Sequence, residues 1–403
     1  MKSKRLEYVD VAKGIGIICT VIGHAFTGTM TAKVIYTFHM PMFFFVSGYL
    51  YHEKSTKELF VKSFKRLLVP YITTCLCFLG YYIIDKIVTD NISLIEVGLR
   101  LHGLAALYGI GSNSKMTISF LPDIRIVGVL WFLLAMFVAQ MVFNWLVKKR
   151  FCPLFLSVGI LAGLSYVTAQ WFFLPWSIQP ALGALIFMYA GYIVQQKDWM
   201  YVVPRKHKLL MIPMAAIWLV SMRYGTCNMV SNQYKTSLTF FGYSIPALSG
   251  AIVIIAGICG SMFVLWLSTL IAKYIKPMSA LLGYTGRESL VILCLHKLEL
   301  NYVPTSNWAS HFFESDTIQF AVLLIVMKMA VIYLGLFLVR RIPVFSLAFY
   351  GTVKTPRQIR RKKRIKRKLR KIDRQKNFDN SEKEFFELSD RIKDKREEVT
   401  GGQ

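Results

Sequence analysis

The first apolar stretch of the chain carries three ionisable residues on one side of a predicted helix. Asp10 and Lys13 are three residues apart, so their side chains are predicted to pair. Lys13 and His24 are eleven residues apart, which places them on one face at a separation of about 16 Å along the axis. Because ionisable groups inside an apolar helix are costly, at about 2.5–3.5 kcal/mol each on insertion scales, this set indicates function.

Two further apolar stretches carry histidines at a similar predicted depth. His39 begins a stretch that runs antiparallel to the first, and Pro41 beside it is expected to distort that helix and free backbone carbonyls. His296 falls in the outer half of a stretch over 279–300. The residues predicted deeper in this stretch are Arg287, Glu288 and Ser289. We therefore expect His24, His39 and His296 to form one layer.

Histidine suits proton transfer near neutral pH, because its unperturbed pKa is about 6.5. No serine lies in a nucleophile elbow, no ligand set has the spacing of a metal site, and no phosphate loop is present. The pattern favours acyl or proton transfer by histidine without a metal. A proton-coupled transporter or flippase would use the same residue types. A structural membrane protein that organises a synthesis complex is a third alternative, but it leaves the histidines unexplained.

The elements that position these residues are predicted to be membrane-spanning helices. Of the 403 residues, 55% are hydrophobic and 18% are charged, whereas soluble domains carry about a quarter charged residues. We expect an all-α, polytopic membrane protein with about ten spans. The predicted spans are 8–27, 34–51, 67–84, 126–147, 154–173, 177–195, 209–223, 244–271, 279–300 and 317–339. The amphipathic stretch 94–110 suits a surface or re-entrant helix better than a span.

The net charge of +27 is distributed in a way that predicts topology rather than nucleic-acid binding. With ten spans, one set of loops before the C-terminal tail holds 17 lysines and arginines, and the opposite set holds 7. This bias places both termini in the cytoplasm. A multi-pass protein of a bacterial plasma membrane is expected, and no nucleic-acid partner.

The chain is predicted to divide into a membrane domain over 1–345 and a basic cytoplasmic tail over 346–403. Between Lys354 and Lys376 the tail holds fourteen basic residues and one acid. Such a run beside a span predicts attraction to anionic lipid headgroups, at about 1 kcal/mol per basic residue. Apolar residues at helical spacing from Phe378 onward indicate a partly helical tail.

Several sequence blocks resemble the membrane acyltransferase family 3, in the branch similar to fucose 4-O-acetylases. The N-terminal blocks are RLEYVDVAKGIGI at 5–17, Gly23-His24, and FHMPMFFFVSG at 38–48. Later blocks are KRLLVPY at 65–71, LWFL at 130–133, and GYTGRES at 283–289 followed by His296. The resemblance covers residues 5–340. It implies about ten spans and O-acylation of envelope or exported glycans, with cytoplasmic acetyl-CoA as donor and no metal.

The resemblance also implies roles for individual residues. A family hallmark is Arg-x10-His, and the matching pair here is Lys13-x10-His24; lysine keeps the charge but loses the bidentate fork of arginine. The implied catalytic residues are His24 and His39, and the implied donor-binding residues are Lys13, Asp10, Lys65 and Arg66. The other candidates are Trp131, Arg287, Glu288, Ser289 and His296.

The implied acceptor is a glycan or a lipid-linked sugar. No soluble esterase-like domain is expected after the last span. We therefore expect either a stand-alone enzyme or one that passes the acyl group to a separate protein. Lys328, in the last span, is expected to pair with another group or to snorkel.

Overall fold

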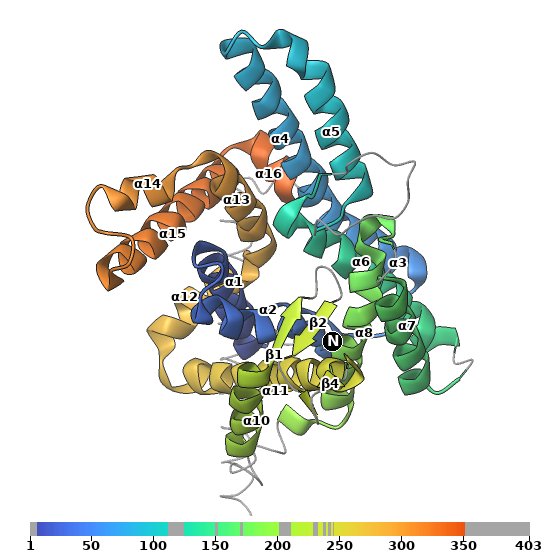
Figure 1. Ribbon diagram of the computed structural model, residues 1–403. Helices are drawn as coiled ribbons and strands as arrows, with labels where there is room; N and C mark the ends of the chain where they lie inside the picture. Colours follow the sequence, from blue (N-terminus) through green and yellow to red (C-terminus); the bar gives the residue numbers. More distant parts are fainter. Residues whose placement is uncertain are drawn as a thin grey trace, which may run out of the picture.

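The computed structural model describes residues 6–111, 125–149, 152–169, 172–200, 211–228, 233–236, 239–240, 243–244 and 246–350. Helices dominate these residues, with α1 and α2 surrounded by the others (Figure 1). The predicted tail beyond 350 lies outside the described residues and stays a prediction. Residues 346–350 belong to a helix, α16 (Pro343–Tyr350), which crosses the predicted domain boundary and packs against α4 and α15.

The helix α1 (Glu7–Ala25) packs directly against α12 (Lys276–Arg287). A Cβ atom on Gly14 would lie 2.1 Å from the carbonyl oxygen of Leu282, and one on Gly286 would lie 1.7 Å from that of Asp10. Both positions therefore require glycine. This contact between backbones holds α1, and with it Lys13 and His24, against the C-terminal part of the chain.

The helix α2 (Met30–Tyr49) returns beside α1 and also packs against α8 (Ile178–Gln196) and α11 (Pro246–Tyr274). Thr29 caps its N-terminus by accepting a hydrogen bond from the amide of Ala32. Pro41 lies inside α2, which nevertheless continues over 20 residues, so the helix accommodates the proline without a break. The antiparallel arrangement predicted for the first two apolar stretches is present.

The described residues between α2 and α8 form further helices and short turns. Their helices are α3 (Thr56–Ser63), α4 (Val69–Val88), α5 (Ile95–Tyr108), α6 (Trp131–Lys149) and α7 (Leu154–Thr168). Their short turns are η1 (Phe64–Leu68), η2 (Ile92–Leu94), η3 (Gly128–Leu130) and η4 (Pro175–Ser177). The α4–α5 hairpin projects from the top of the molecule in Figure 1. The stretch 94–110 thus contains a short helix, as predicted.

The predicted span over 279–300 is two helices rather than one. α12 ends at Arg287 and α13 (Ser289–Tyr302) begins after a break at Glu288. The Glu288 carboxylate accepts hydrogen bonds from Arg340 and from Tyr350, which lie on α15 and α16. The 14 residues of α13 reach about 21 Å, which is short of a hydrocarbon core of about 30 Å. Contacts from distant elements therefore stabilise a break that hydropathy does not reveal.

The helix α15 (Ile318–Arg341) follows the short helix α14 (Thr305–Ser310) and has one buried face and one exposed face. Its buried stripe consists of residues about four apart, namely Phe320, Leu324, Lys328, Ile332 and Leu336. Its exposed stripe includes Ile318, Val322 and Val326. This pattern suits a helix with one face in lipid and one in the bundle, and it directs Lys328 inward.

Six segments of the described residues are long and apolar enough to cross a membrane. They are Glu7–Ala25, Thr56–Val88, Gly128–Lys149, Pro175–Gln196, Ala251–Tyr274 and Ile318–Arg341. Each overlaps a predicted span. Of the other predicted spans, α7 has 15 residues and α10 (Met211–Tyr224) has 14, while α2 is long but does not count among the six. A multi-pass membrane architecture is supported, whereas ten spans and cytoplasmic termini stay predictions.

The expectation of a purely helical chain is corrected in one region. Between α10 and α11, β1 (Gly225–Asn228) pairs antiparallel with β2 (Gln233–Thr236). A second short pair joins β3 (Thr239–Phe240) to β4 (Tyr243–Ser244). Pairs this short lack the hydrophobic periodicity by which a strand is recognised in a sequence.

Candidate active site

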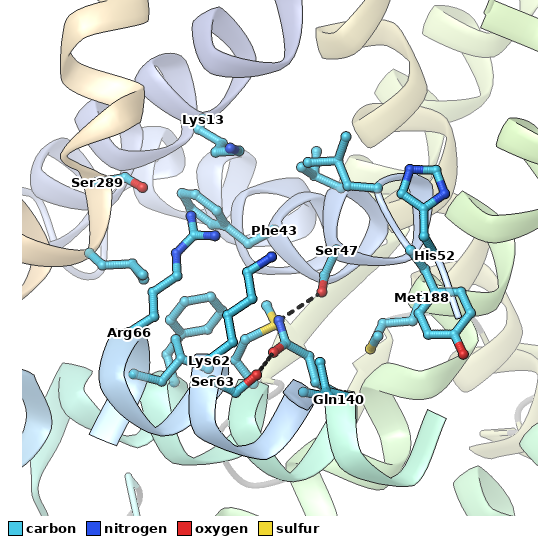
Figure 2. Close-up of a pocket in the computed structure, with 18 of the residues that line it drawn as sticks. Lys13, Phe43, Ser47, His52, Lys62, Ser63, Arg66, Gln140, Met188 and Ser289 are labelled. Carbon is cyan, nitrogen blue, oxygen red and sulfur yellow. Dashed lines mark hydrogen bonds between the residues drawn. The ribbon is translucent and has the colours of Figure 1, made fainter. Parts of the chain in front are cut away.

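A cavity of about 210 Å³ lies between α1, α2, α3, η1 and α6, and we call it the basic cavity (Figure 2). Four cationic side chains line it, namely Lys13, Lys54, Lys62 and Arg66, and no acidic side chain does. Figure 2 shows Lys13, Lys62 and Arg66 extending toward a common space. The cavity brings together three predicted residues, Lys13, Arg66 and Ser289. Sequence reasoning missed Lys54 and Lys62, whose signal was a lysine-rich loop counted only toward topology.

Lys13 enters the cavity from α1, where the predicted pair with Asp10 is present. The Nζ atom of Lys13 lies 3.4 Å from Oδ1 of Asp10, and the Asp10 side chain is buried. Buried charges are stabilised by such pairing. Asp10 itself does not line the cavity. Its position indicates that it orients Lys13 rather than contacting a ligand there.

Lys65 and Arg66 were both predicted to bind the donor, but the structure separates them. Both residues are exposed and lie in the π-helical turn η1, yet only Arg66 lines the basic cavity. A π-helical turn shifts the side-chain register of the helix, and such turns are frequent at functional sites. The prediction for Lys65 is therefore not supported by the geometry of the cavity.

One wall of the basic cavity is a chain of neutral hydrogen bonds. The Ser63 hydroxyl donates to Oε1 of Gln140 at 2.8 Å, and Nε2 of Gln140 donates to the Ser47 hydroxyl at 3.1 Å (Figure 2). These bonds join α3, α6 and α2. They satisfy polar groups on the wall while leaving the cationic groups to set its charge.

A small, narrow cavity lies beside the basic cavity, on the side of the histidines, and we call it the constriction. It is a cavity of about 10 Å³ that shares Phe43, Phe132, Ser289 and Leu290 with the basic cavity. Ile17 and Thr20 also line it, and they lie on α1 between Lys13 and His24. The space along α1 between the cationic side chains and His24 is therefore narrow and mostly apolar at the constriction.

The three predicted histidines do meet in one layer, beyond this constriction. The ring centroids of His24 and His296 are 5.6 Å apart. Tyr36 lies between His24 and His39, with centroid distances of 5.9 and 5.3 Å. The Nδ1–H group of His39 donates to the carbonyl of Ile35 at 2.9 Å. His24 and His296 thus form a direct pair, while His39 supports it through Tyr36.

His296 belongs to a buried polar network that sequence reasoning missed in part. Its Nδ1 lies 3.2 Å from Oε2 of Glu299, whose Oε1 accepts bonds from Lys328 at 2.7 Å and Thr305 at 2.8 Å. A carboxylate accepts hydrogen bonds, so Nδ1 of His296 carries the proton and Nε2 is the basic nitrogen. That Nε2 is buried, and no described residue forms a hydrogen bond with it. The His-x-x-Glu spacing on one helix face was the available signal, and the expectation that Lys328 pairs is confirmed.

Two remaining candidates, Trp131 and Glu288, are buried and contact other side chains of the protein. Trp131 is buried at the start of α6 with its ring against Phe132. Glu288 is buried and bound by Arg340 and by Tyr350, whose hydroxyl donates at 2.5 Å. Burial and the nearby Glu288 carboxylate raise the pKa of Tyr350, so its phenol stays protonated and donates. Arg287 is exposed at the end of α12 and does not line the basic cavity.

The comparisons with known proteins identify the family of the chain. The family model for the acyltransferase domain of acyltransferase family 3 matches residues 6–337. A comparison with curated proteins gave no match. The matched range runs from α1 into α15 and includes the basic cavity, the constriction and the three histidines. The chain therefore belongs to acyltransferase family 3.

Proposed function

We propose that the protein is a membrane O-acyltransferase that moves an acetyl group from acetyl-CoA to a hydroxyl of an envelope or exported glycan. The observation that carries this proposal is the order along α1 of the basic cavity, the adjoining constriction and the His24–His296 pair. The family match favours acyl transfer over proton-coupled transport. A bacterial plasma membrane is part of the proposal, and the charge bias of the loops supports a basic cavity that faces the cytoplasm.

The basic cavity is suited to the phosphates of CoA. Its four cations carry positive charge with no acidic group among the lining residues, and charge-assisted bonds to phosphate are the strong kind. From Lys13, the pantetheine arm would extend along α1 for about 16 Å to His24. Met40 lines the constriction, and the flexible methionine side chain can yield to a narrow ligand. The thioester would then lie beside the histidine pair.

His24 is the member of the pair that is only partly buried, so we assign it contact with the acceptor. It takes the proton of the acceptor hydroxyl while that oxygen bonds to the thioester carbonyl carbon. The carbon–sulfur bond then breaks, and the proton passes from His24 to the CoA thiolate. The Glu299 carboxylate, held by Lys328, stabilises positive charge on the histidine pair during this step. Direct transfer to the glycan, or through a separate acyl-accepting protein, uses the same step.

Label transfer from radiolabelled acetyl-CoA into base-labile glycan tests the function. Membranes containing the protein are incubated with envelope glycans or lipid-linked sugars of the source cell. We expect transfer by the wild type, a fall of roughly tenfold or more in Lys13→Ala, and near-normal transfer in Lys13→Arg, which keeps the charge beside Asp10. Absence of transfer by a folded wild-type protein with any acyl donor would contradict the proposal.

A matched pair of adjacent residues tests the assignment of the basic cavity. Arg66→Ala is expected to raise the KM for acetyl-CoA roughly tenfold or more, because a charge-assisted contact is lost. Lys65→Ala removes the same charge from the same exposed turn but leaves the cavity lining intact, so its KM should change less than about twofold. Equal effects of the two substitutions would show that net charge, rather than this cavity, governs donor binding.

A further inference from the structure

A second cavity, of about 110 Å³, lies between α4, α5, the 125–130 segment and α13, and we call it the distal cavity. Its lining includes Arg125, His102, Lys297 and Asn301. The function proposed above does not use these residues. Among the described residues that line this cavity, none has an acidic side chain.

The distal cavity and the basic cavity lie toward opposite ends of the same elements. On α13, Ser289 lines the basic cavity and Lys297 lines the distal cavity, at a separation of about 12 Å along the helix. Likewise, Arg66 in η1 lines the basic cavity, and Phe78, further along the chain in α4, lines the distal cavity. His296 precedes Lys297 directly, so along α13 the histidine pair and the distal cavity lie at a similar depth. A molecule in the distal cavity would therefore lie at the level of the pair and further along α13 than the donor phosphates.

Positive charge is concentrated in the distal cavity. The Nζ atom of Lys297 lies 5.1 Å from the ring centroid of Phe78, a cation–π contact. Among the described residues, no carboxylate forms an ion pair with Lys297 or Arg125. Burial, together with Arg125 and Lys297, lowers the pKa of His102, which lies outside the six candidate spans. At neutral pH His102 is thus an uncharged hydrogen-bonding group beside two cations.

The backbone at Gly128 keeps space for the Lys297 ammonium group. Gly128 has φ +61°, and a Cβ atom there would lie 2.8 Å from Nζ of Lys297. Both the left-handed backbone and the close approach therefore favour glycine. Lys297 follows His296 directly on α13, so an anion bound to Lys297 would lie at a similar depth to the histidine pair along that helix.

We propose that the distal cavity binds an anionic group of the acceptor, either a carboxylate or a phosphate, and so presents a neighbouring hydroxyl to His24. This inference rests on the proposed acyl transfer and narrows its acceptor to acidic glycans or phosphate-bearing sugars. Lys297 and Arg125 supply the charge, and His102 and Asn301 supply neutral hydrogen bonds. Both cations remain available because the donor phosphates are held in the separate basic cavity.

The test uses the full chain in membranes, radiolabelled acetyl-CoA, and source-cell glycans separated by anion exchange into anionic and neutral pools. We expect base-labile label in the anionic pool. Lys297→Gln and Arg125→Gln should each raise the KM for that pool roughly tenfold or more with little change in kcat, and Lys297→Arg should restore it. Prior chemical reduction of carboxyl groups removes a carboxylate acceptor, and prior cleavage of phosphate esters removes a phosphate acceptor.

The outcomes separate this inference from the function on which it rests. Equal labelling of the neutral pool by the wild type and both variants would overturn the acidic acceptor while leaving acyl transfer intact. Unchanged KM values for the anionic pool would also overturn it. A wild type that labels neither pool contradicts acyl transfer itself and the acceptor site with it. Acetyl-CoA binding by both variants, measured in the same membranes, establishes that each is folded.

Discussion

Replacement of His24 by alanine is expected to lower acyl transfer by about 10²–10⁴-fold, the range typical of a lost general base. His24 is the partly buried partner of the His24–His296 pair and lies beyond the constriction that leads from the basic cavity. His296 does not replace it, because its ring, including the basic Nε2, is fully buried and so does not reach an acceptor. Label transfer from acetyl-CoA measures the effect.

The control for His24→Ala is His311→Ala, which removes an exposed histidine far along the chain from the three-histidine layer. Transfer by His311→Ala should equal that of the wild type. Acetyl-CoA binding by His24→Ala should also be unchanged, since His24 does not line the basic cavity. Retention of full transfer in His24→Ala would remove His24 from the reaction.

Replacement of Glu299 by glutamine is expected to reduce kcat by roughly 10²–10³-fold, the range typical of one lost group that stabilises charge in the transition state. A neutral amide does not stabilise positive charge on the His24–His296 pair, which Oε2 of Glu299 contacts through Nδ1 of His296 at 3.2 Å. The change also leaves the Lys328 ammonium group without its anionic partner at 2.7 Å. Loss of one partner from a buried ion pair costs about 3–5 kcal/mol, so thermal stability should fall as well.

A double variant separates the two effects of Glu299. Glu299→Gln combined with Lys328→Met removes both charges, so the buried ammonium group is no longer unpaired. We expect its melting temperature to recover toward that of the wild type while kcat stays low. Recovery of both stability and transfer would mean that the carboxylate serves folding alone. The measurements are thermal unfolding in detergent and label transfer under saturating acetyl-CoA.

The relative positions of the ionisable residues on α1 were predicted from the geometry of a single helix. Helical periodicity placed Asp10 beside Lys13, and placed Lys13 and His24 on one face. Depth along antiparallel helices brought His24, His39 and His296 into one layer, as the ring contacts show. These predictions succeeded because positions within one helix, and between consecutive antiparallel helices, depend on rise and rotation per residue. The finer topology of ten spans rests on hydropathy, on the charge bias of the loops and on the family resemblance.

Contacts between distant segments had no such local signal. The bond between Lys328 and Glu299 joins α15 to α13, and the spacing of residues along either helix does not predict it, whereas the link of Glu299 to His296 follows from their i,i+3 spacing. The break at Glu288 likewise depends on Arg340 and Tyr350, which arrive from α15 and α16. Both features depend on how helices pack laterally, which the spacing of residues along one helix does not determine.

By itself, the sequence determined the family resemblance, the apolar helices and the alignment of Lys13 with His24, because periodicity and composition act within short segments. The tertiary structure decided which cations surround a common cavity. It placed Lys54, Lys62 and Arg66 at the basic cavity and left Lys65 outside it, although Lys65 and Arg66 share the π-helical turn η1. It also put Lys297 in a second cavity at the other end of the helices. The physical reason is that a cavity forms from side chains of several helices, so its charge depends on their packing and rotation.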